Sequence, residues 1–100
     1  MNDKNEFNKA VESYEEALLI RRKLAGVNPQ TYLSDVASTL NNLGIIYSTK
    51  NKFDKAVESY KEALSKYRDL AGMNPSAYLP NVATTLNNLG NLYRSILYYS

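Results

Sequence analysis

The stretch Thr39-Leu40-Asn41-Asn42-Leu43-Gly44 returns 46 residues later as Thr85-Leu86-Asn87-Asn88-Leu89-Gly90. The similarity extends on both sides of this stretch. A shift of 46 residues aligns residues 5–49 with residues 51–95, and 28 of the 45 aligned pairs are identical. Two segments this similar share the same local structure, so an internal repeat decides the fold.

Each copy is predicted to form two helices, because apolar residues recur at spacings of three and four. Gly26 and Gly72 are predicted to end the first helix of each copy in the left-handed conformation. Asn28-Pro29 and Asn74-Pro75 then read as a helix cap followed by a proline in the next first turn. The apolar stripe of the first helix type consists of Phe7, Ala10, Val11, Tyr14, Ala17, Leu18 and Leu24, with equivalents from Phe53 to Leu70. The stripe of the second helix type consists of Leu33, Val36, Ala37, Leu40, Leu43 and Tyr47.

The pattern predicts one all-α domain over residues 1–100 and no strand. Helices are expected at about 4–25, 30–49, 53–71 and 76–97. We call the first and third helices B-type and the others A-type, so the order is B-A-B-A, with neighbours packed antiparallel across short turns. Pro80 removes a backbone donor and disfavours helix at Leu79, so the last helix is expected either to kink or to start late there.

Composition excludes several classes of function. The chain is 44% apolar and 22% charged, which is typical of a folded domain, and its net charge of +2 creates no strong field for nucleic acid or an anionic membrane. Cysteine and histidine are absent, so no disulfide, thiolate nucleophile or ordinary zinc site can form. We predict no cofactor, no metal and no catalysis. The polar first residues lack the apolar segment of a secretory signal, so we expect a cytoplasmic location.

These stripes resemble the tetratricopeptide repeat family, whose first helix carries a large residue, a leucine-glycine pair and an aromatic residue. The resemblance implies an α-solenoid of antiparallel helix pairs acting as a non-catalytic protein–protein interaction module. The period of 46 instead of the usual 34 is similar to kinesin light chains and prokaryotic multi-repeat proteins, and Arg22 and Arg68 replace the usual proline. The matching residues are Leu40, Leu43-Gly44, Tyr47, Leu86, Leu89-Gly90 and Tyr93 in the A-type helices, and Phe7, Ala10, Tyr14, Ala17, Phe53, Ala56, Tyr60 and Ala63 in the B-type helices.

In this family the A-type helices line a groove that holds extended peptides. A carboxamide offers two donors and an acceptor, so a ladder of asparagines suits a peptide backbone, and an arginine suits an acidic group. The same asparagines could equally be a solvated polar face. By the resemblance, the groove-facing residues are Ser38, Asn41, Asn42, Ile45 and Ser48 in one copy and Thr84, Asn87, Asn88, Asn91 and Arg94 in the other.

Both outer helices of the predicted stack lack a neighbour, so we expect self-association into a dimer or a head-to-tail assembly. Exchange of helices through the Thr49–Lys52 turn is an alternative route. Another is that the chain is a piece of a longer array whose other repeats cover these faces. The residues predicted to take part are Ala10, Tyr14, Ala17, Leu89, Leu92, Tyr93, Ile96, Leu97 and Tyr99.

Nucleic-acid binding is the alternative function, because Arg21-Arg22-Lys23 forms a basic run. The equivalent positions in the other copy are Tyr67, Arg68 and Asp69, so no basic stripe continues along the repeats. Charged residues close in sequence, such as Glu12, Glu15, Glu16, Lys9 and Lys23, are typical of a solvated helix face and predict no active site.

Overall fold

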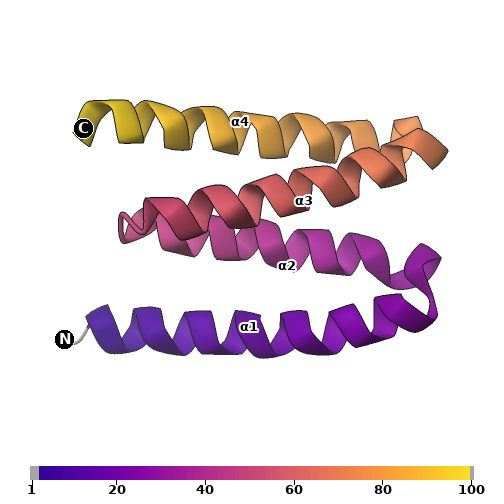
Figure 1. Ribbon diagram of the computed structural model, residues 1–100, viewed down its shortest axis with the longest axis horizontal. Coiled ribbons are helices and arrows are strands. Elements are labelled where there is room, and N and C mark those ends of the chain that lie inside the picture. The colour runs from indigo at the N-terminus through magenta and orange to yellow at the C-terminus, as the bar shows by residue number, and fades with distance from the viewer. Residues whose placement is uncertain (1–2, 100) are drawn as a thin grey trace.

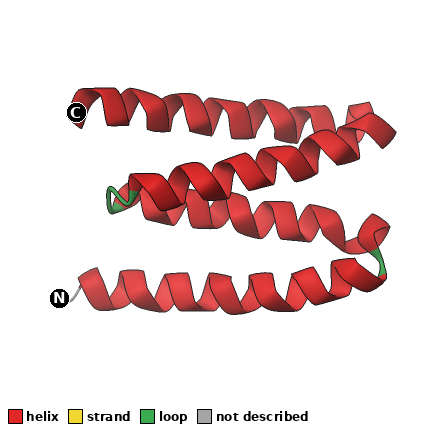
Figure 2. Cartoon of the chain, viewed as in Figure 1, coloured by secondary structure: helices red, strands yellow, loops and turns green. Residues whose placement is uncertain are grey.

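The computed structural model describes residues 3–99, with side chains from Asn5 onward, as four helices and no strand (Figure 2). They are α1 (Asp3–Val27), α2 (Pro29–Thr49), α3 (Phe53–Met73) and α4 (Pro75–Tyr99). The predicted bounds differ from these by at most two residues at each end, and the all-α prediction is confirmed.

A single asparagine separates the helices at each B-to-A junction. Asn28 and Asn74 have almost the same backbone angles, φ −139° and ψ 81° against φ −141° and ψ 82°. The side-chain oxygen of Asn28 accepts from the backbone N–H of the third residue after it, at 3.3 Å, and Asn74 repeats this bond at the same distance. Each asparagine therefore caps the following helix, which begins on a proline.

The predicted glycine ends of α1 and α3 are wrong. Gly26 and Gly72 lie inside their helices, and no described glycine has a positive φ. The backbone N–H of Asn28 still donates to the carbonyl of Leu24, at 2.8 Å, so the helical bonding continues past the glycine. The break falls one residue later, where asparagine supplies the cap and proline fixes the next turn.

Of the two alternatives left open at Pro80, a kink or a late start, the late start is wrong, because α4 begins at Pro75 and continues through Pro80. Pro80 lies in the second turn on an exposed side of the helix, where the carbonyl that loses its N–H partner belongs to the exposed Ser76. The Thr84 hydroxyl donates back to the carbonyl of Pro80 at 3.0 Å. Because Ser76 is exposed, water can hydrogen-bond its carbonyl in place of the missing N–H without ending the helix.

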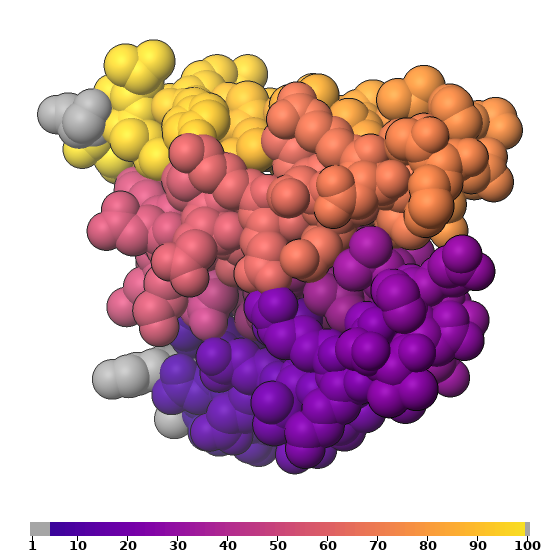
Figure 3. Space-filling model, turned by 45° about the vertical axis from the view of Figure 1, so that its right-hand side comes forward, coloured from indigo at the N-terminus to yellow at the C-terminus, as the bar shows by residue number. Residues whose placement is uncertain are grey.

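The helices stack in chain order, with α1 and α4 at opposite edges (Figures 1 and 3). Each helix packs on the next, and α2 also approaches α4, whereas no Cα of α1 comes within 8 Å of a Cα of α3. The molecule measures 41 × 28 × 18 Å. The stack is therefore closer along its α2/α4 side than along its α1/α3 side.

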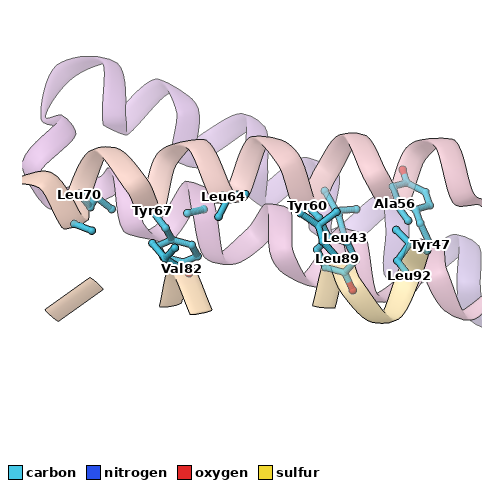
Figure 4. Close-up of a cluster of buried hydrophobic side chains, with 12 residues drawn as sticks. Leu43, Tyr47, Ala56, Tyr60, Leu64, Tyr67, Leu70, Val82, Leu89 and Leu92 are labelled. Atoms are coloured by element: carbon cyan, nitrogen blue, oxygen red, sulfur yellow. The ribbon is translucent and has the colours of Figure 1, made fainter. Parts of the chain in front are cut away.

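The core lies on α3, which is covered by α2 and α4 on its two sides. Tyr60 is buried beside Leu43 of α2 and Leu89 of α4 (Figure 4). A Cβ added to Gly44 would come within 2.5 Å of the Tyr60 ring, so only glycine lets α2 approach this aromatic side chain. Ala56 and Ala63 on α3 are fully buried and permit the same close approach.

Candidate functional site

The close approach of α2 and α4 brings two stretches of equal sequence side by side. Asn41 and Asn88 lie on facing sides of these helices, and the Nδ2 of Asn88 donates to the Oδ1 of Asn41 at 3.3 Å. Both are half-buried. This bond links the two A-type helices directly and marks the middle of a groove between them.

The groove contains two hollows, each between α2 and α4 over a tyrosine of α3. The larger has a volume of about 380 Å³ and the smaller about 150 Å³. Tyr60 contributes to the larger and Tyr67 to the smaller. The other lining residues of the larger are Ile45, Ser48, Thr49, Asn88, Asn91, Leu92 and Ser95, and those of the smaller are Asn41, Pro80, Asn81 and Thr84.

No residue lining either hollow carries a formal charge at neutral pH. Burial raises the pKa of Tyr60 above its ordinary value, against an opposing hydrogen bond with Ser48. Burial also raises the pKa of Tyr67, against opposing hydrogen bonds with Asn81 and Ser38. Both phenols therefore stay protonated. The groove offers neutral donors and acceptors above an aromatic floor, which suits backbone amides and uncharged side chains better than ions.

Some of the predicted groove residues line the two hollows, and the others lie outside them. Asn41, Ile45, Ser48, Thr84, Asn88 and Asn91 line the hollows. Ser38, Asn42, Asn87 and Arg94 line neither hollow, and all except the half-buried Asn42 are exposed. Tyr60 and Tyr67 of α3 were not among the predicted groove residues. Their spacing of seven residues puts them on one helix face, which is the signal that could have found them.

The outer face of α4 carries a second candidate surface, because its apolar residues recur with heptad spacing and no described segment covers them. Leu86 and Tyr93 are each 44% exposed, whereas their equivalents on α2, Leu40 and Tyr47, are 3% and 7% exposed. We call this face the α4 stripe. It consists of Leu79, Ala83, Leu86, Gly90 and Tyr93, all exposed.

The structure corrects part of the predicted self-association set. Leu89 and Leu92 are buried against α3 within the chain, and Ile96 is half-buried against the same core. They lie on the side of α4 that already has a neighbour, whereas Tyr93 and Leu97 lie on the exposed side. Tyr99 is exposed as well, although its ring stacks on Phe53 with the centroids 6.2 Å apart.

At the other edge of the stack, α1 is covered on one side only. Ala10, Tyr14, Ala17 and Leu18 are half-buried, whereas the equivalent residues of α3 are buried. Phe7 packs edge-on to Tyr47 of α2, at 6.3 Å between ring centroids. The side of α1 that α2 does not cover therefore remains open.

Two residues of the basic run already have partners inside the chain. Arg21 donates to the Thr39 hydroxyl at 2.6 Å. Arg22 bridges from α1 to α3 and donates to both carboxylate oxygens of Glu62, at 2.5 and 3.0 Å. The hydrogen bond from Arg22 lowers the pKa of Glu62, and the bond raises the pKa of Arg22. The run serves packing between helices, and nothing in the structure favours nucleic-acid binding.

Within residues 3–99, no three or more aspartate and glutamate side chains gather as they would around a metal ion. The helices of this region also include none with the length and apolar character needed to span a bilayer.

Comparison with known proteins adds one match. A family model described as tetratricopeptide repeat matches residues 2–69, which is more than half of the chain. No curated protein and no solved structure matches the sequence.

Proposed function

Because the chain belongs to the tetratricopeptide repeat family, we propose that it is a non-catalytic binding module whose α2/α4 groove holds an extended, uncharged segment of another polypeptide. Repeats of this family generally mediate protein–protein interaction. The observation that carries the proposal is the pair of neutral hollows on either side of the Asn88–Asn41 bond. Amides and hydroxyls there can satisfy a peptide backbone, while the tyrosine floor packs against its side chains.

A display library of random peptides, selected on the native chain, provides the probe. Selected peptides are expected to be poor in charged residues and to bind the double variant Asn41→Ala/Asn91→Ala about tenfold or more weakly, because two hydrogen-bonding amides are lost. Gln30→Ala is the matched control, since Gln30 is an exposed amide side chain on α2 that lines neither hollow. Peptides that bind the double variant as tightly as the native chain would remove the groove from consideration.

The second part of the proposal is that the open faces of α1 and α4 bind copies of the chain. Supporting it are the exposed α4 stripe and the half-buried α1 residues Tyr14 and Ala17. Light scattering over micromolar to sub-millimolar concentrations is expected to show a mass that rises with concentration. A constant monomer mass would contradict self-association and leave the peptide groove to its own test.

A further inference from the structure

We propose that the α4 stripe is the docking surface for α1 of a second copy, in the register in which α3 covers α2. This inference rests on the self-association proposed above, and it adds which faces meet and how they align. Its basis is an equivalence within the chain. The α4 stripe repeats the buried α2 face 46 residues later, and α1 repeats the helix that covers that face.

The helix that would cover the α4 stripe, α1, is similar in sequence to α3, the helix that covers α2 within the chain. Residues 7–27 of α1 and 53–73 of α3 are identical at 14 of 21 positions. α3 is buried on two sides, by α2 and by α4, whereas α1 packs on α2 alone. The side left open on α1 corresponds to the side of α3 that covers α2. A second copy therefore brings to the α4 stripe a helix of the right sequence with the right face unoccupied.

The steric centre of the proposed joint is Gly90. Inside the chain, Gly44 faces the Tyr60 ring so closely that an added Cβ would come within 2.5 Å of it. Around Gly90 an added Cβ meets nothing within 4 Å, because no described segment lies there. In the equivalent register, Tyr14 of the second copy fills this space against Gly90.

Charge complementarity supports the same register. The ion pair between Arg22 and Glu62 joins consecutive B-type helices, and it is the only ion pair among the described residues. In the proposed joint, α1 of the next copy follows α3 as α3 follows α1 within one chain. Arg68 is the equivalent of Arg22, and Glu16 is the equivalent of Glu62, so Arg68 of one copy faces Glu16 of the next. Both are exposed, and they carry opposite charges at the positions where the joint needs them.

Two further contacts extend in the same way. Asn42 is the equivalent of Asn88, and Asn87 is the equivalent of Asn41. In the joint, Asn42 of the second copy therefore donates to Asn87, which lies outside both hollows within one chain. The Lys55 ammonium, 5.6 Å from the centre of the Tyr47 ring, becomes Lys9 of the second copy over Tyr93. The two copies of the repeat within the chain differ at 17 of the 45 aligned positions. Every residue in the four contacts used here, the glycine–tyrosine, arginine–glutamate, asparagine–asparagine and lysine–tyrosine contacts, is the same in both copies.

Such a joint uses different faces on the two copies, so it leaves one open face at each end and can extend head to tail. It also sets α2 of the second copy beside α4 of the first, which lengthens the peptide groove across the joint. A two-fold dimer, or exchange of helices through the Thr49–Lys52 turn, would not pair Arg68 with Glu16 in this register.

Charge reversal tests the register by sedimentation velocity at low salt. Arg68→Glu and Glu16→Arg are each expected to weaken self-association about threefold to tenfold, because an attraction becomes a repulsion. The double variant alone should regain native association, since every joint again pairs opposite charges. An equimolar mixture of the two single variants should associate more strongly than either variant alone, because joints between unlike copies pair opposite charges while joints between like copies do not. Arg22→Glu is the matched control, because it disturbs the equivalent pair inside one chain and leaves association unchanged.

Gly90→Ala adds a steric test that does not depend on salt. It is expected to weaken association about tenfold or more, since the new methyl group meets the Tyr14 ring of the second copy. Gly26→Ala is its control, because its equivalent Gly72 has open space around it even though α3 is covered on two sides.

Three results would overturn the proposal in distinguishable ways. If the native chain self-associates but the single charge reversals associate normally, the register is wrong and self-association stands. If the double charge reversal does not recover while Gly90→Ala still weakens association, the α4 stripe is used by a different partner face. If the native chain is a monomer throughout, the joint and the self-association are both refuted, while the peptide-binding test of the α2/α4 groove is unaffected.

Discussion

The α2 and α4 helices share a leucine, a glycine and a tyrosine at equivalent positions, yet the structure places these residues in opposite environments. Leu40 and Tyr47 are buried beneath neighbouring helices, whereas Leu86 and Tyr93 lie half in water. The local sequence is the same, so the difference arises from the helix that covers one face and is missing from the other. A buried face and an exposed face of this molecule therefore carry the same apolar pattern in two settings.

The largest expected effect comes from truncating the leucine of each pair. Leu40→Ala should lower the free energy of unfolding by about 2–5 kcal/mol, because it leaves a cavity in the core. Leu86→Ala should cost less than about 1 kcal/mol, since its side chain is already 44% exposed. Denaturant unfolding at dilutions where the chain is monomeric measures both. Equal losses would mean that the α4 face is covered within one chain.

The glycine pair should change stability in opposite directions. Gly44→Ala introduces a methyl group against the Tyr60 ring and should destabilise the chain by about 1–3 kcal/mol. Gly90→Ala meets nothing and should stabilise α4 by up to about 1 kcal/mol, because alanine is the better helix former. Thermal melts of the two variants decide the sign. A destabilising Gly90→Ala in dilute solution would break the comparison.

The asparagine caps should behave alike, because each side chain accepts from the backbone N–H three residues later at 3.3 Å. Asn28→Ala and Asn74→Ala each remove a side-chain cap and should cost about 1 kcal/mol. Matching losses in urea unfolding would show that the shared cap contributes equally at the two junctions. Losses that differ by more than twofold would show that the two junctions are not equivalent.

The smallest effect concerns the ion pair between α1 and α3. Arg22→Gln should cost about 0.2–1 kcal/mol at neutral pH, since both side chains are partly exposed and screened by water. Arg22 holds the pKa of Glu62 below its ordinary value, so the contribution is present above that value and is lost as the pH falls through the lowered pKa. Arg68→Gln is the control and should not change unfolding of the monomer.

The difference in unfolding free energy between the native chain and Arg22→Gln, followed from pH 7 downward, checks this linkage. It should shrink on acidification and vanish once Glu62 is protonated. A difference that grows at low pH would contradict the assigned sign.

The internal repeat made the number and order of the helices and the Asn-Pro junctions predictable, because these depend on the spacing of apolar residues and on short local motifs. The glycine ends were not predictable, since Asn28 and Asn74 could take the break as readily as Gly26 and Gly72. The spacing of apolar residues also could not show which side of α4 is covered, because Leu89 and Tyr93 belong to adjacent apolar faces of one helix. That distinction depends on where α3 lies.

The groove was predictable in its walls and not in its floor. Asn41 and Asn88 stand on helix faces that the repeat pattern identifies. Tyr60 and Tyr67 belong to the apolar stripe of α3, so the sequence predicts that they are core residues. Only the structure shows that hollows remain between α2 and α4 and that the two tyrosines line them. The Asn88–Asn41 bond likewise joins residues 47 apart in sequence.

Hydroxyl-radical footprinting of Tyr47 and Tyr93 on the native chain, across a dilution series, tests the central comparison most directly. We expect Tyr93 to be oxidised faster than Tyr47 in dilute solution and to become protected as the concentration rises, while Tyr47 stays protected throughout. Equal protection of the two tyrosines at the greatest dilution would contradict the uncovered face of α4.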